Sequence, residues 1–250
     1  MLDLKGKTVL VTGASRGIGA ATARALSDAG ARVLVHASRA SDAFGGVVAD
    51  VCFEPEDAII EDLSAPAAGF RLFEQAAKAA PRIDGVVNNA GIYIESRLDG
   101  AREDWSAAWA TTHAVNVQAP ADLCHAAIAH YRKVGGGIVV NIASRAGHRG
   151  DAIDGAAYAA SKGAVLAMTK TFARQLAAEN MLFYAIAPGW VETRMAPKDV
   201  EARRKALSEI PLGRVADPEE VAAMCLFLLT GACASATGAT FDINGASYVR

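Results

Sequence analysis

Short apolar runs that alternate with longer segments constrain the fold of this chain more than any other feature. The runs have the length of buried strands, and the segments between them have the length of helices. Parallel strands need helical crossovers, so the alternation predicts a mostly parallel sheet of about seven strands covered on both faces. The expected strands are 8–12, 32–36, 58–60, 85–88, 137–142, 183–187 and 240–243, and expected helices include 20–29, 69–79, 105–134, 156–179 and 218–229.

The length of the chain agrees with a single domain of this kind. No linker, repeat or low-complexity tract divides the 250 residues. A chain of this size can bury a substantial core in one unit. We therefore expect one doubly wound α/β domain over residues 1–250.

The first expected strand leads into a glycine-rich turn and then a helix. Residues 9–19 read VLVTGASRGIG, a GxxxGxG pattern, whereas the usual dinucleotide fingerprint is GxGxxG. Gly13 can make the tight turn, Gly17 lets the backbone approach a phosphate, and Gly19 lets helix and strand come close. The pattern indicates a phosphate site, although glycines at a helix entry can also serve turn geometry alone.

A tyrosine and a lysine four residues apart, Tyr158 and Lys162, indicate acid–base chemistry. Four residues is just over one helical turn, so both side chains project from the same helix face. An ammonium about 4 Å from the phenol, at an effective dielectric near 20, would favour the phenolate by roughly 4 kcal/mol, or about three pKa units. That shift would bring Tyr158 into the working range of an acid–base catalyst. The same spacing also occurs by chance on solvated helix faces.

Six motifs together resemble the short-chain dehydrogenase/reductase family, from about Leu4 to the C-terminus. The turn at 12–19 is similar to that family's cofactor loop, and residues 88–91 (NNAG) are similar to its second signature, which steadies the central sheet. Residues 188–193 (PGWVET) match the segment that lies against the nicotinamide. The four positions that match the family's catalytic tetrad are Asn116, Ser144, Tyr158 and Lys162. The resemblance implies a Rossmann fold and a homotetramer or homodimer.

The resemblance also implies an NAD(P)(H)-dependent oxidoreductase that moves hydride between nicotinamide and a carbonyl or secondary alcohol. Tyr158 would transfer the proton at oxygen, and Ser144 would orient that oxygen. Lys162 would lower the pKa of Tyr158 and hold the nicotinamide ribose, and Asn116 would hold a water that links Lys162 to solvent. The implied cofactor contacts are Gly13, Ser15, Arg16, Gly17, Ile18, Gly19, Ser38, Arg39, Asp62, Leu63, Asn89, Ala90, Gly91, Tyr158, Lys162, Pro188, Gly189, Val191 and Thr193.

The end of the second strand bears on the choice between NADP(H) and NAD(H). Ala37 stands where relatives that prefer NAD typically carry Asp, which would accept hydrogen bonds from the ribose diol and repel a 2′-phosphate. Arg16 and Arg39 could instead pair with that phosphate, and Ser38 could donate a hydrogen bond. NADP(H) is therefore the favoured cofactor, with solvated arginines as the alternative. Asp62 is expected to accept from the adenine amino group or to cap the following helix.

Charge and cysteine content limit the partners and the compartment. A formal charge of −2, with Lys and Arg scattered among acids, gives no footprint for nucleic acid or an anionic membrane. The first residues lead directly into a strand without a signal peptide pattern, and residues 221–229 are too short to span a membrane. The four cysteines show no CxxC spacing and are expected to be buried thiols. These features predict a cytoplasmic protein without a metal, nucleic-acid or membrane partner.

The substrate is the least determined part of the function. The chain resembles 3-oxoacyl-[acyl-carrier-protein] reductases and related sugar and ketone dehydrogenases, but Glu179 stands where carrier-protein reductases carry a base. Arg132 and Lys133 could supply half of a carrier-protein surface. The loop at 145–157 is polar, so a compact polar or anionic substrate is the alternative, with Arg145, His148 and Trp190 as candidate contacts. Residues 192–211 are the expected substrate lid, or else an ordinary surface helix.

A second class of function stays open at this point. A catalytically silent relative would bind nucleotide and act as a sensor or assembly subunit. The intact tetrad favours a working enzyme, because silent relatives commonly lose one of its members.

Overall fold

The predicted parallel sheet is confirmed. The structure is a computed structural model that describes residues 2–52, 54–197 and 199–250. Within these residues seven strands form one sheet in the order β3-β2-β1-β4-β5-β6-β7, and every neighbouring pair is parallel. The strands are β1 (Thr8–Val11), β2 (Arg32–Ala37), β3 (Ala58–Ile60), β4 (Gly85–Asn88), β5 (Gly137–Ile142), β6 (Met181–Pro188) and β7 (Thr240–Ile243). Each lies where the sequence predicted it, with small shifts at the ends.

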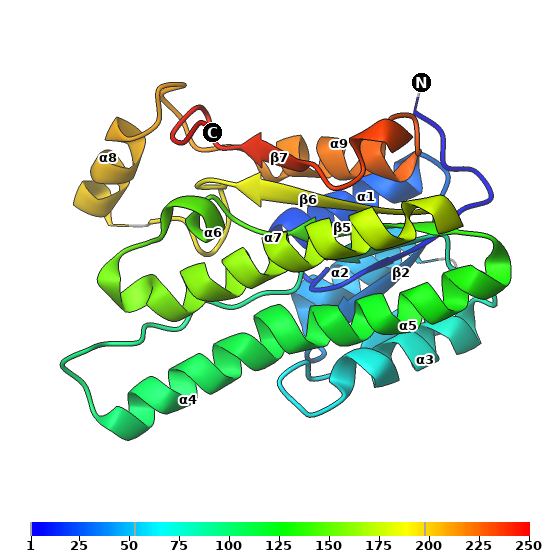
Figure 1. The fold of residues 1–250 in the computed structure, drawn as a ribbon, viewed down its shortest axis with the longest axis horizontal. Coiled ribbons are helices and arrows are strands. Elements are labelled where there is room, and N and C mark those ends of the chain that lie inside the picture. Colours follow the sequence, from blue (N-terminus) through cyan, green and yellow to red (C-terminus); the bar gives the residue numbers. More distant parts are fainter. Residues whose placement is uncertain (1, 53, 198) are drawn as a thin grey trace.

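Helices cover both faces of the sheet, as Figure 1 shows. The longer ones are α1 (Gly17–Asp28), α2 (Asp42–Val51), α3 (Ala68–Ala79), α4 (Arg102–His113), α5 (Ala119–Val134), α7 (Ala156–Leu176), α8 (Val200–Ser208) and α9 (Pro218–Leu229). Alternate residues of β1 enter opposite cores: Val9 and Val11 pack with α1, α2 and α9, and Leu10 packs with α3, α5 and α7. A strand buried on both faces is therefore apolar throughout, which explains the continuous runs in the sequence.

The long helix expected at 105–134 is interrupted at its centre. A π-helical segment, Ala114–Gln118, joins α4 to α5 and contains Asn116. Single π-turns inside α-helices are rare and are found frequently at functional sites. The hydrophobic pattern could not predict the interruption, because the π-helical segment shifts the backbone hydrogen bonds by one residue only.

One helix, α2, was not predicted. Gly45 and Gly46 lie within it, and glycine is unfavourable in a helix interior by about 1 kcal/mol relative to Ala. Ser41 caps its N-terminus by accepting a hydrogen bond from the Phe44 N–H at 3.2 Å. Tertiary packing outweighs the glycines, since α2 buries Phe44, Val47 and Val51 against the core.

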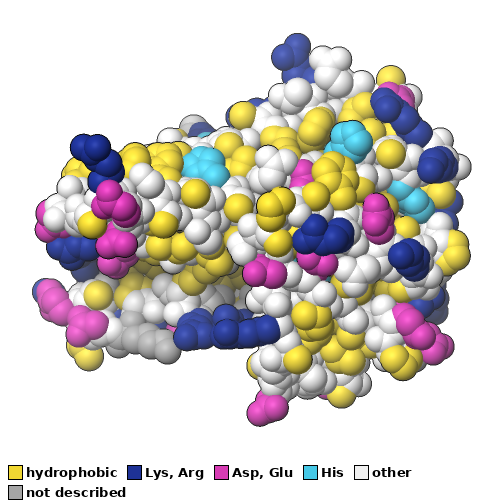
Figure 2. All heavy atoms as spheres, turned by 90° about the horizontal axis from the view of Figure 1, so that it is seen from below, with side chains coloured by type: hydrophobic (Ala, Val, Ile, Leu, Met, Phe, Trp, Pro, Cys, Tyr) yellow, Lys and Arg dark blue, Asp and Glu magenta, His cyan; other side chains and the backbone are white. Residues whose placement is uncertain are grey.

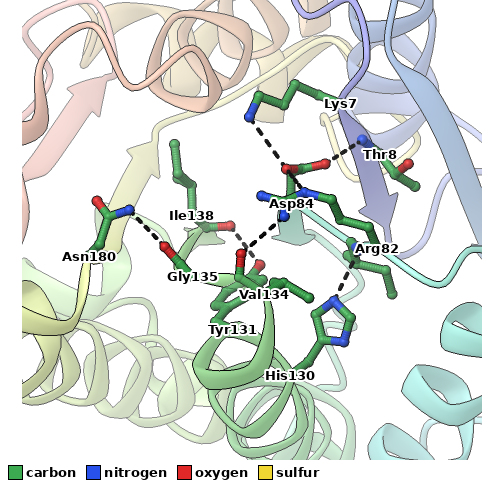
Figure 3. Close-up of polar contacts among 11 residues, drawn as sticks. Lys7, Thr8, Arg82, Asp84, His130, Tyr131, Val134, Gly135, Ile138 and Asn180 are labelled. Carbon is green, nitrogen blue, oxygen red and sulfur yellow. Dashed lines mark hydrogen bonds and ion pairs between the residues drawn. The ribbon is translucent and has the colours of Figure 1, made fainter.

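A network of polar side chains lies at the amino-terminal ends of the strands, which we call the amino-terminal edge of the sheet (Figure 3). Asp84, just before β4, accepts from the Thr8 N–H at 3.0 Å, from Arg82 Nε at 2.8 Å and from Lys7 Nζ at 3.4 Å. Nearby, the Tyr131 hydroxyl donates to the Ile138 carbonyl at 3.2 Å. The network ties the end of α5 to the starts of β1, β4 and β5.

The opposite, carboxyl-terminal edge carries the loops that hold the chemistry-bearing motifs. In Figure 1 the arrows of β6 and β7 point to the left, towards α8 and the short helix α6 (Ala146–Arg149). In open α/β sheets ligands bind outside the carboxyl ends of the strands. This edge is therefore where the predicted site residues have to meet.

Candidate active site

The glycine loop at 13–19 is held against the loop after β4. Gly13 and Gly17 have φ angles of +64° and +55°, a region that favours glycine. Asn89 Nδ2 donates to the carbonyl oxygens of Thr12 at 2.8 Å and Gly13 at 3.1 Å. A Cβ on Gly19 would lie 2.3 Å from the Gly13 oxygen, so Gly19 is required for close packing against the loop itself. Gly19 therefore makes the close approach that the sequence predicted, and the segment that it approaches is the glycine loop.

His36, at the end of β2, fixes the loop from below and was missed in the sequence. The Gly13 N–H donates to His36 Nδ1 at 3.2 Å, and His36 Nε2 lies 2.9 Å from the Glu61 carbonyl. Nδ1 must therefore be the unprotonated nitrogen and Nε2 the donor. Burial lowers the pKa of His36, which suits the neutral ring. The sequence feature that could have indicated this role is a histidine near the end of an otherwise apolar strand.

The N-terminus of α1 opens beside this loop. The helix begins at Gly17, and its N-cap residue, Arg16, makes no side-chain capping bond. The first backbone N–H groups of a helix attract anions when no side chain satisfies them. A Cβ on Gly17 would lie 3.0 Å from Thr193 Cγ2, so the first and last predicted motifs meet here. A glycine cradle at an uncapped helix start fits the diphosphate of a dinucleotide.

Tyr158, Lys162 and Ser144 converge beyond the loop. Lys162 is 4% exposed, its Nζ donates to the Ile142 carbonyl at 2.8 Å, and it lies 5.7 Å from the centroid of the Tyr158 ring. Burial lowers the pKa of Lys162 to about 8. Burial also raises the pKa of Tyr158 to about 12 and outweighs a hydrogen bond with Ser144, which acts to lower it.

The direction expected for the Tyr158 pKa is therefore wrong for this structure. The sequence argument placed an ammonium about 4 Å from the phenol, but the Lys162 ammonium is bonded to a carbonyl of β5. The helical spacing gave the shared face correctly and could not give the burial. Tyr158 is consequently protonated at neutral pH and can act as a proton donor.

Asn116 is committed to the backbone beside the site. Its Oδ1 accepts from the Ile92 N–H at 2.9 Å, and its Nδ2 donates to the Ile92 carbonyl at 2.9 Å and to Ser161 Oγ at 3.1 Å. A Cβ on Gly91 would lie 3.4 Å from both Asn116 Oδ1 and Lys162 Nζ. The side chain thus clamps the loop after β4 to α7. Its predicted water stays a prediction.

One cavity of about 890 Å³ joins the glycine loop to the Tyr158 end. The predicted residues that line it are Gly13, Ser15, Arg16, Gly17, Ile18, Ser38, Asp62, Leu63, Asn89, Ala90, Gly91, Ser144, Arg145, Tyr158, Lys162, Pro188, Gly189, Trp190, Val191 and Thr193. Figure 2 shows the molecule from below, with its surface hollowed at the left and charges of both signs interspersed. The fold has brought nearly all the predicted contacts to one space.

Three predicted contacts have surroundings that bear on their expected roles. His148 does not line the cavity, and its ring stacks on that of Tyr248 at a centroid distance of 5.8 Å, so its substrate contact remains a prediction. Arg39 is exposed and also lies outside the lining, so its phosphate contact remains a prediction. Asp62 accepts from the Ser64 N–H at 2.9 Å, and α3 begins only at Ala68, so Asp62 does not cap that helix.

Several lining residues were not among the predicted contacts. Tyr93 follows the NNAG motif, and its ring lies 5.3 Å from that of Tyr158. Arg149 and Asp151 come from the polar loop, and Arg194 comes from the expected lid. Their polarity was visible in the sequence, but nothing in it showed which of them face the cavity.

Comparisons with known proteins agree with this geometry. The family model described as enoyl-(acyl carrier protein) reductase matches residues 13–246. A 3-oxoacyl-[acyl-carrier-protein] reductase from Synechocystis sp. is 37% identical over 250 residues, covering 98% of both chains. The chain belongs to the short-chain dehydrogenase/reductase family. It is therefore an NAD(P)(H)-dependent oxidoreductase by family, and the predicted resemblance is confirmed.

Two solved structures show how the fold is shared across different substrates. A 3-oxoacyl-(acyl-carrier-protein) reductase from Agrobacterium tumefaciens, with NADP bound, superposes with a TM-score of 0.88 at 32% identity, covering 98% of this chain and 95% of its own. A protein provisionally named as an NAD(P)-dependent gluconate 5-dehydrogenase, from Beutenbergia cavernae and also with NADP, gives 0.88 at 30% identity, covering 98% and 97%. Similarity of this short-chain dehydrogenase/reductase to both leaves its substrate to be argued from the site.

Arg132, which the sequence offered for a carrier-protein surface, is paired with an acid. Arg132 binds Glu179 through two hydrogen bonds, of 2.7 and 3.0 Å. Glu179, at the position where the resemblance led us to expect a base, therefore pairs with one of the two cations expected there. Separately, no helix of the described part of the chain is long and apolar enough to cross a membrane.

Proposed function

We propose that this chain reduces a compact polar carbonyl compound, or oxidises the corresponding secondary alcohol, with NADP(H) as its cofactor. One observation carries the proposal. A single cavity joins an uncapped helix start and Arg16 at one end to Ser144, Tyr158 and Lys162 at the other. The glycine cradle fits the diphosphate of a nicotinamide dinucleotide, and the half-buried Tyr158 fits a proton donor to the substrate.

The roles of the side chains follow from their surroundings. When bound, NADPH would supply a hydride to the carbonyl carbon, and NADP⁺ would accept one from the carbinol carbon of the alcohol. Tyr158 gives the proton to the oxygen during reduction and takes it back during oxidation, and the Ser144 hydroxyl orients the same oxygen. Lys162, buried and directed at the Ile142 carbonyl, holds positive charge beside the phenol and can bind ribose hydroxyls. Asn116 keeps the loop after β4 in register with α7.

NADP(H) is favoured over NAD(H) by the residues around the end of β2. Ala37 is only 3% exposed and supplies no carboxylate for a ribose diol. Ser38 and Arg16 both line the cavity and can bind a 2′-phosphate. Introducing an acid, Ala37→Asp, should shift the preference towards NADH. Retention of a full preference for NADPH in that variant would count against this placement of the phosphate.

A 3-oxoacyl-[acyl-carrier-protein] is the second candidate substrate, because relatives of this chain carry that name. The Arg132–Glu179 pair weakens the basic surface that an acidic carrier protein would need. A direct comparison is the rate of NADPH oxidation with acetoacetyl-carrier protein and with small polar ketones. The proposal expects the free ketones to be the better substrates.

The same assay separates a working enzyme from a silent nucleotide-binding relative. We expect NADPH consumption with at least one carbonyl compound in a panel of polar ketones and sugars, and its loss in Tyr158→Phe. Tight NADPH binding without turnover on any member of the panel or on the carrier-protein substrate would support the silent relative.

Domain organisation, assembly and location complete the proposal. We infer one dinucleotide-binding domain over residues 1–250, with residues 192–211 as a substrate lid, since Arg194 and Met195 line the cavity while α8 is largely exposed. Residue Lys198 lies outside the described part of this lid. Limited proteolysis with and without NADPH and substrate would test it, because a lid should become protected on closure.

We propose a homotetramer or homodimer built on α4, α5 and α7, and a cytoplasmic location. Trp105 on α4 is 36% exposed, which suits a contact between subunits. All four cysteines are free thiols; Cys124 and Cys225 are buried as expected, whereas Cys52 is half-buried and Cys233 exposed. Light scattering at micromolar concentration would test assembly, and cell fractionation would test location.

A further inference from the structure

A buried arginine lies directly beside the proposed catalytic serine. Arg145 follows Ser144, and its side chain is only 6% exposed. Its backbone N–H donates to the Pro188 carbonyl at 2.9 Å, which fixes the residue between the β5 and β6 loops. Arg145 lines the cavity at the Tyr158 end. Arginine is almost never buried without a partner, so this position needs an explanation.

The guanidinium has no hydrogen bond to any side chain or carbonyl in the described part of the chain. Its nearest carboxylate oxygen, on Glu209, is 3.5 Å away, and Arg149 reaches the same oxygen at 3.4 Å. Nη1 is buried and has no partner among the described residues. Burial and the neighbouring Arg149 lower the pKa of Arg145, against the opposing effects of Glu209 and Asp151. Five N–H donors in a fixed fork are thus left almost unused.

A neighbouring aromatic ring restricts the orientation of the Arg145 guanidinium. The Arg145 guanidinium lies 6.0 Å from the centroid of the Trp190 ring, a cation–π distance. Trp190 lines the same cavity. A planar ring beside the guanidinium restricts its orientation and leaves an edge available for an acceptor. Planar, bidentate acceptors such as a carboxylate match that edge best.

Charge at this end of the cavity favours an anion. Among the described residues that line it here are three arginines, Arg145, Arg149 and Arg194, and one aspartate, Asp151. Glu209 is shared by two of these arginines and does not line the cavity. The chain as a whole carries a formal charge of −2, so the excess of cations is local. Such a local field raises the concentration of anionic substrates in a cleft.

We propose that Arg145 binds a carboxylate of the substrate, and that the substrate class is short oxo acids and the corresponding hydroxy acids. The proposal rests on the proposed function, because it assigns a group on the compound whose carbonyl Tyr158 protonates. Since Arg145 and Ser144 line the same cavity, the carboxylate and the carbonyl belong to one compact substrate. Arg145 is then a specificity-determining residue, and Arg149 and Arg194 attract the anion to the entrance.

A different role for Arg145 would be to latch the lid through Glu209. The latch and the carboxylate site predict a different dependence of the rate on Glu209 and on substrate charge. A latch depends on Glu209 and acts equally on charged and neutral substrates, whereas a carboxylate site depends on the charge of the substrate. Glu209→Gln is therefore the matched control, because it removes the ion pair and leaves Arg145 in place.

The experiment compares acids with their methyl esters. Rates of NADPH oxidation are measured with pyruvate, acetoacetate and levulinate, each beside its methyl ester, in wild type, Arg145→Met, Arg145→Lys and Glu209→Gln. A charge-assisted bond is worth about 1.5–3 kcal/mol, so the wild type should favour at least one acid over its ester roughly ten- to a hundredfold in kcat/KM. Arg145→Met should remove that preference, mainly by raising KM for the acid.

The remaining variants sharpen the assignment. Arg145→Lys should fall between wild type and Arg145→Met, because it keeps the charge and loses the fork. Glu209→Gln should keep the preference for the acid. Equal loss on acid and ester in both Arg145→Met and Glu209→Gln would show a latch and overturn the proposal.

The ratio of kcat/KM for an acid to kcat/KM for its ester in the wild type tests the carboxylate site even where a variant does not fold. Ester reduction without any preference for acids, and without inhibition of that reduction by the acids, overturns the carboxylate site while leaving the proposed function intact. If neither acids, esters nor the wider carbonyl panel are reduced although NADPH binds, the proposed function itself fails.

Discussion

The two edges of the sheet use buried polar groups in opposite ways. At the amino-terminal edge, Asp84 has three donors within 3.4 Å, and the hydroxyl of the fully buried Tyr131 has the Ile138 carbonyl as its acceptor (Figure 3). At the carboxyl-terminal edge, Lys162 has one hydrogen bond and no ion pair within the described residues, and Arg145 has a buried nitrogen without a partner there.

The difference shows which buried polar groups stabilise the fold and which are available for chemistry. A buried polar group costs free energy unless it is hydrogen-bonded, so a satisfied network can be kept for stability alone. Groups left partly unsatisfied in a cavity are a cost to the fold and retain capacity for a ligand. Four pairs of measurements would break or sharpen this contrast.

The largest effect is expected from the two tyrosines, one at each edge. Tyr158→Phe removes the proton donor and keeps the ring, so turnover should fall by about 10²–10⁴ while the melting temperature changes little. Tyr131→Phe should do the reverse, because it removes a buried hydrogen bond to the Ile138 carbonyl, at a cost of about 0.5–1.5 kcal/mol. Steady-state kinetics and thermal unfolding of both variants give the answer. Near-normal turnover in Tyr158→Phe would remove the basis of the mechanism.

The next effect concerns two arginines near the proposed ribose site. Arg16 lines the cavity and Arg39 does not. Arg16→Ala should weaken NADPH roughly ten- to a hundredfold, the value of a charge-assisted pair of about 1.5–3 kcal/mol, and leave NADH nearly unchanged. Arg39→Ala should have a smaller effect on NADPH. Fluorescence titration with both nucleotides measures this, and equal loss for NADPH and NADH in Arg16→Ala would contradict the phosphate assignment.

A smaller effect is expected on stability from the amino-terminal network. Asp84→Asn removes the charge that Arg82 and Lys7 share and should cost about 1–3 kcal/mol, or a few degrees in melting temperature, without changing turnover at low temperature. Asp99→Asn breaks an exposed pair with Arg97 and serves as the control, with no measurable shift expected. A loss of activity in folded Asp84→Asn would show that the two edges are coupled.

The smallest effect is the pH dependence of the same residue. Burial acts to raise the pKa of Asp84, but the Thr8 N–H, Arg82 and Lys7 outweigh it, so the pKa is lowered. A lowered pKa contributes stability above the unfolded value of about 3.9 and loses it as the pH falls through the folded value. The difference in stability between wild type and Asp84→Asn should therefore shrink below about pH 4. A difference that grows on acidification would contradict this account.

Local features of the fold and site were predictable because they depend on short stretches of chain. Strand positions followed from apolar runs, and the turn at Gly13 followed from residues that tolerate a positive φ. The π-helical segment around Asn116 and the helix α2 were not predictable. In the π-helical segment the backbone hydrogen bonding changes without a change in the hydrophobic pattern. In α2 the packing of Phe44 outweighs the low helix propensity of two glycines.

Roles that depend on a distant partner were the ones the sequence could not settle. The loop residues His148 and Arg145 looked alike in the chain, yet one stacks on Tyr248 and the other enters the cavity. The charge of Arg132 was visible, but its pairing with Glu179, 47 positions away, was not. Charge and polarity belong to the residue, whereas orientation belongs to the packing around it.

The sequence by itself determined the parallel sheet, the family, the glycine cradle and the shared helix face of Tyr158 and Lys162, since spacing along the chain sets each of these locally. Tertiary structure alone decided that burial raises the pKa of Tyr158, that Lys162 bonds to Ile142, and that Arg145 is left with an open fork beside Ser144. The physical reason is that desolvation and hydrogen bonding depend on which distant segments surround a group. That surrounding exists only once the sheet has brought its carboxyl-terminal loops together.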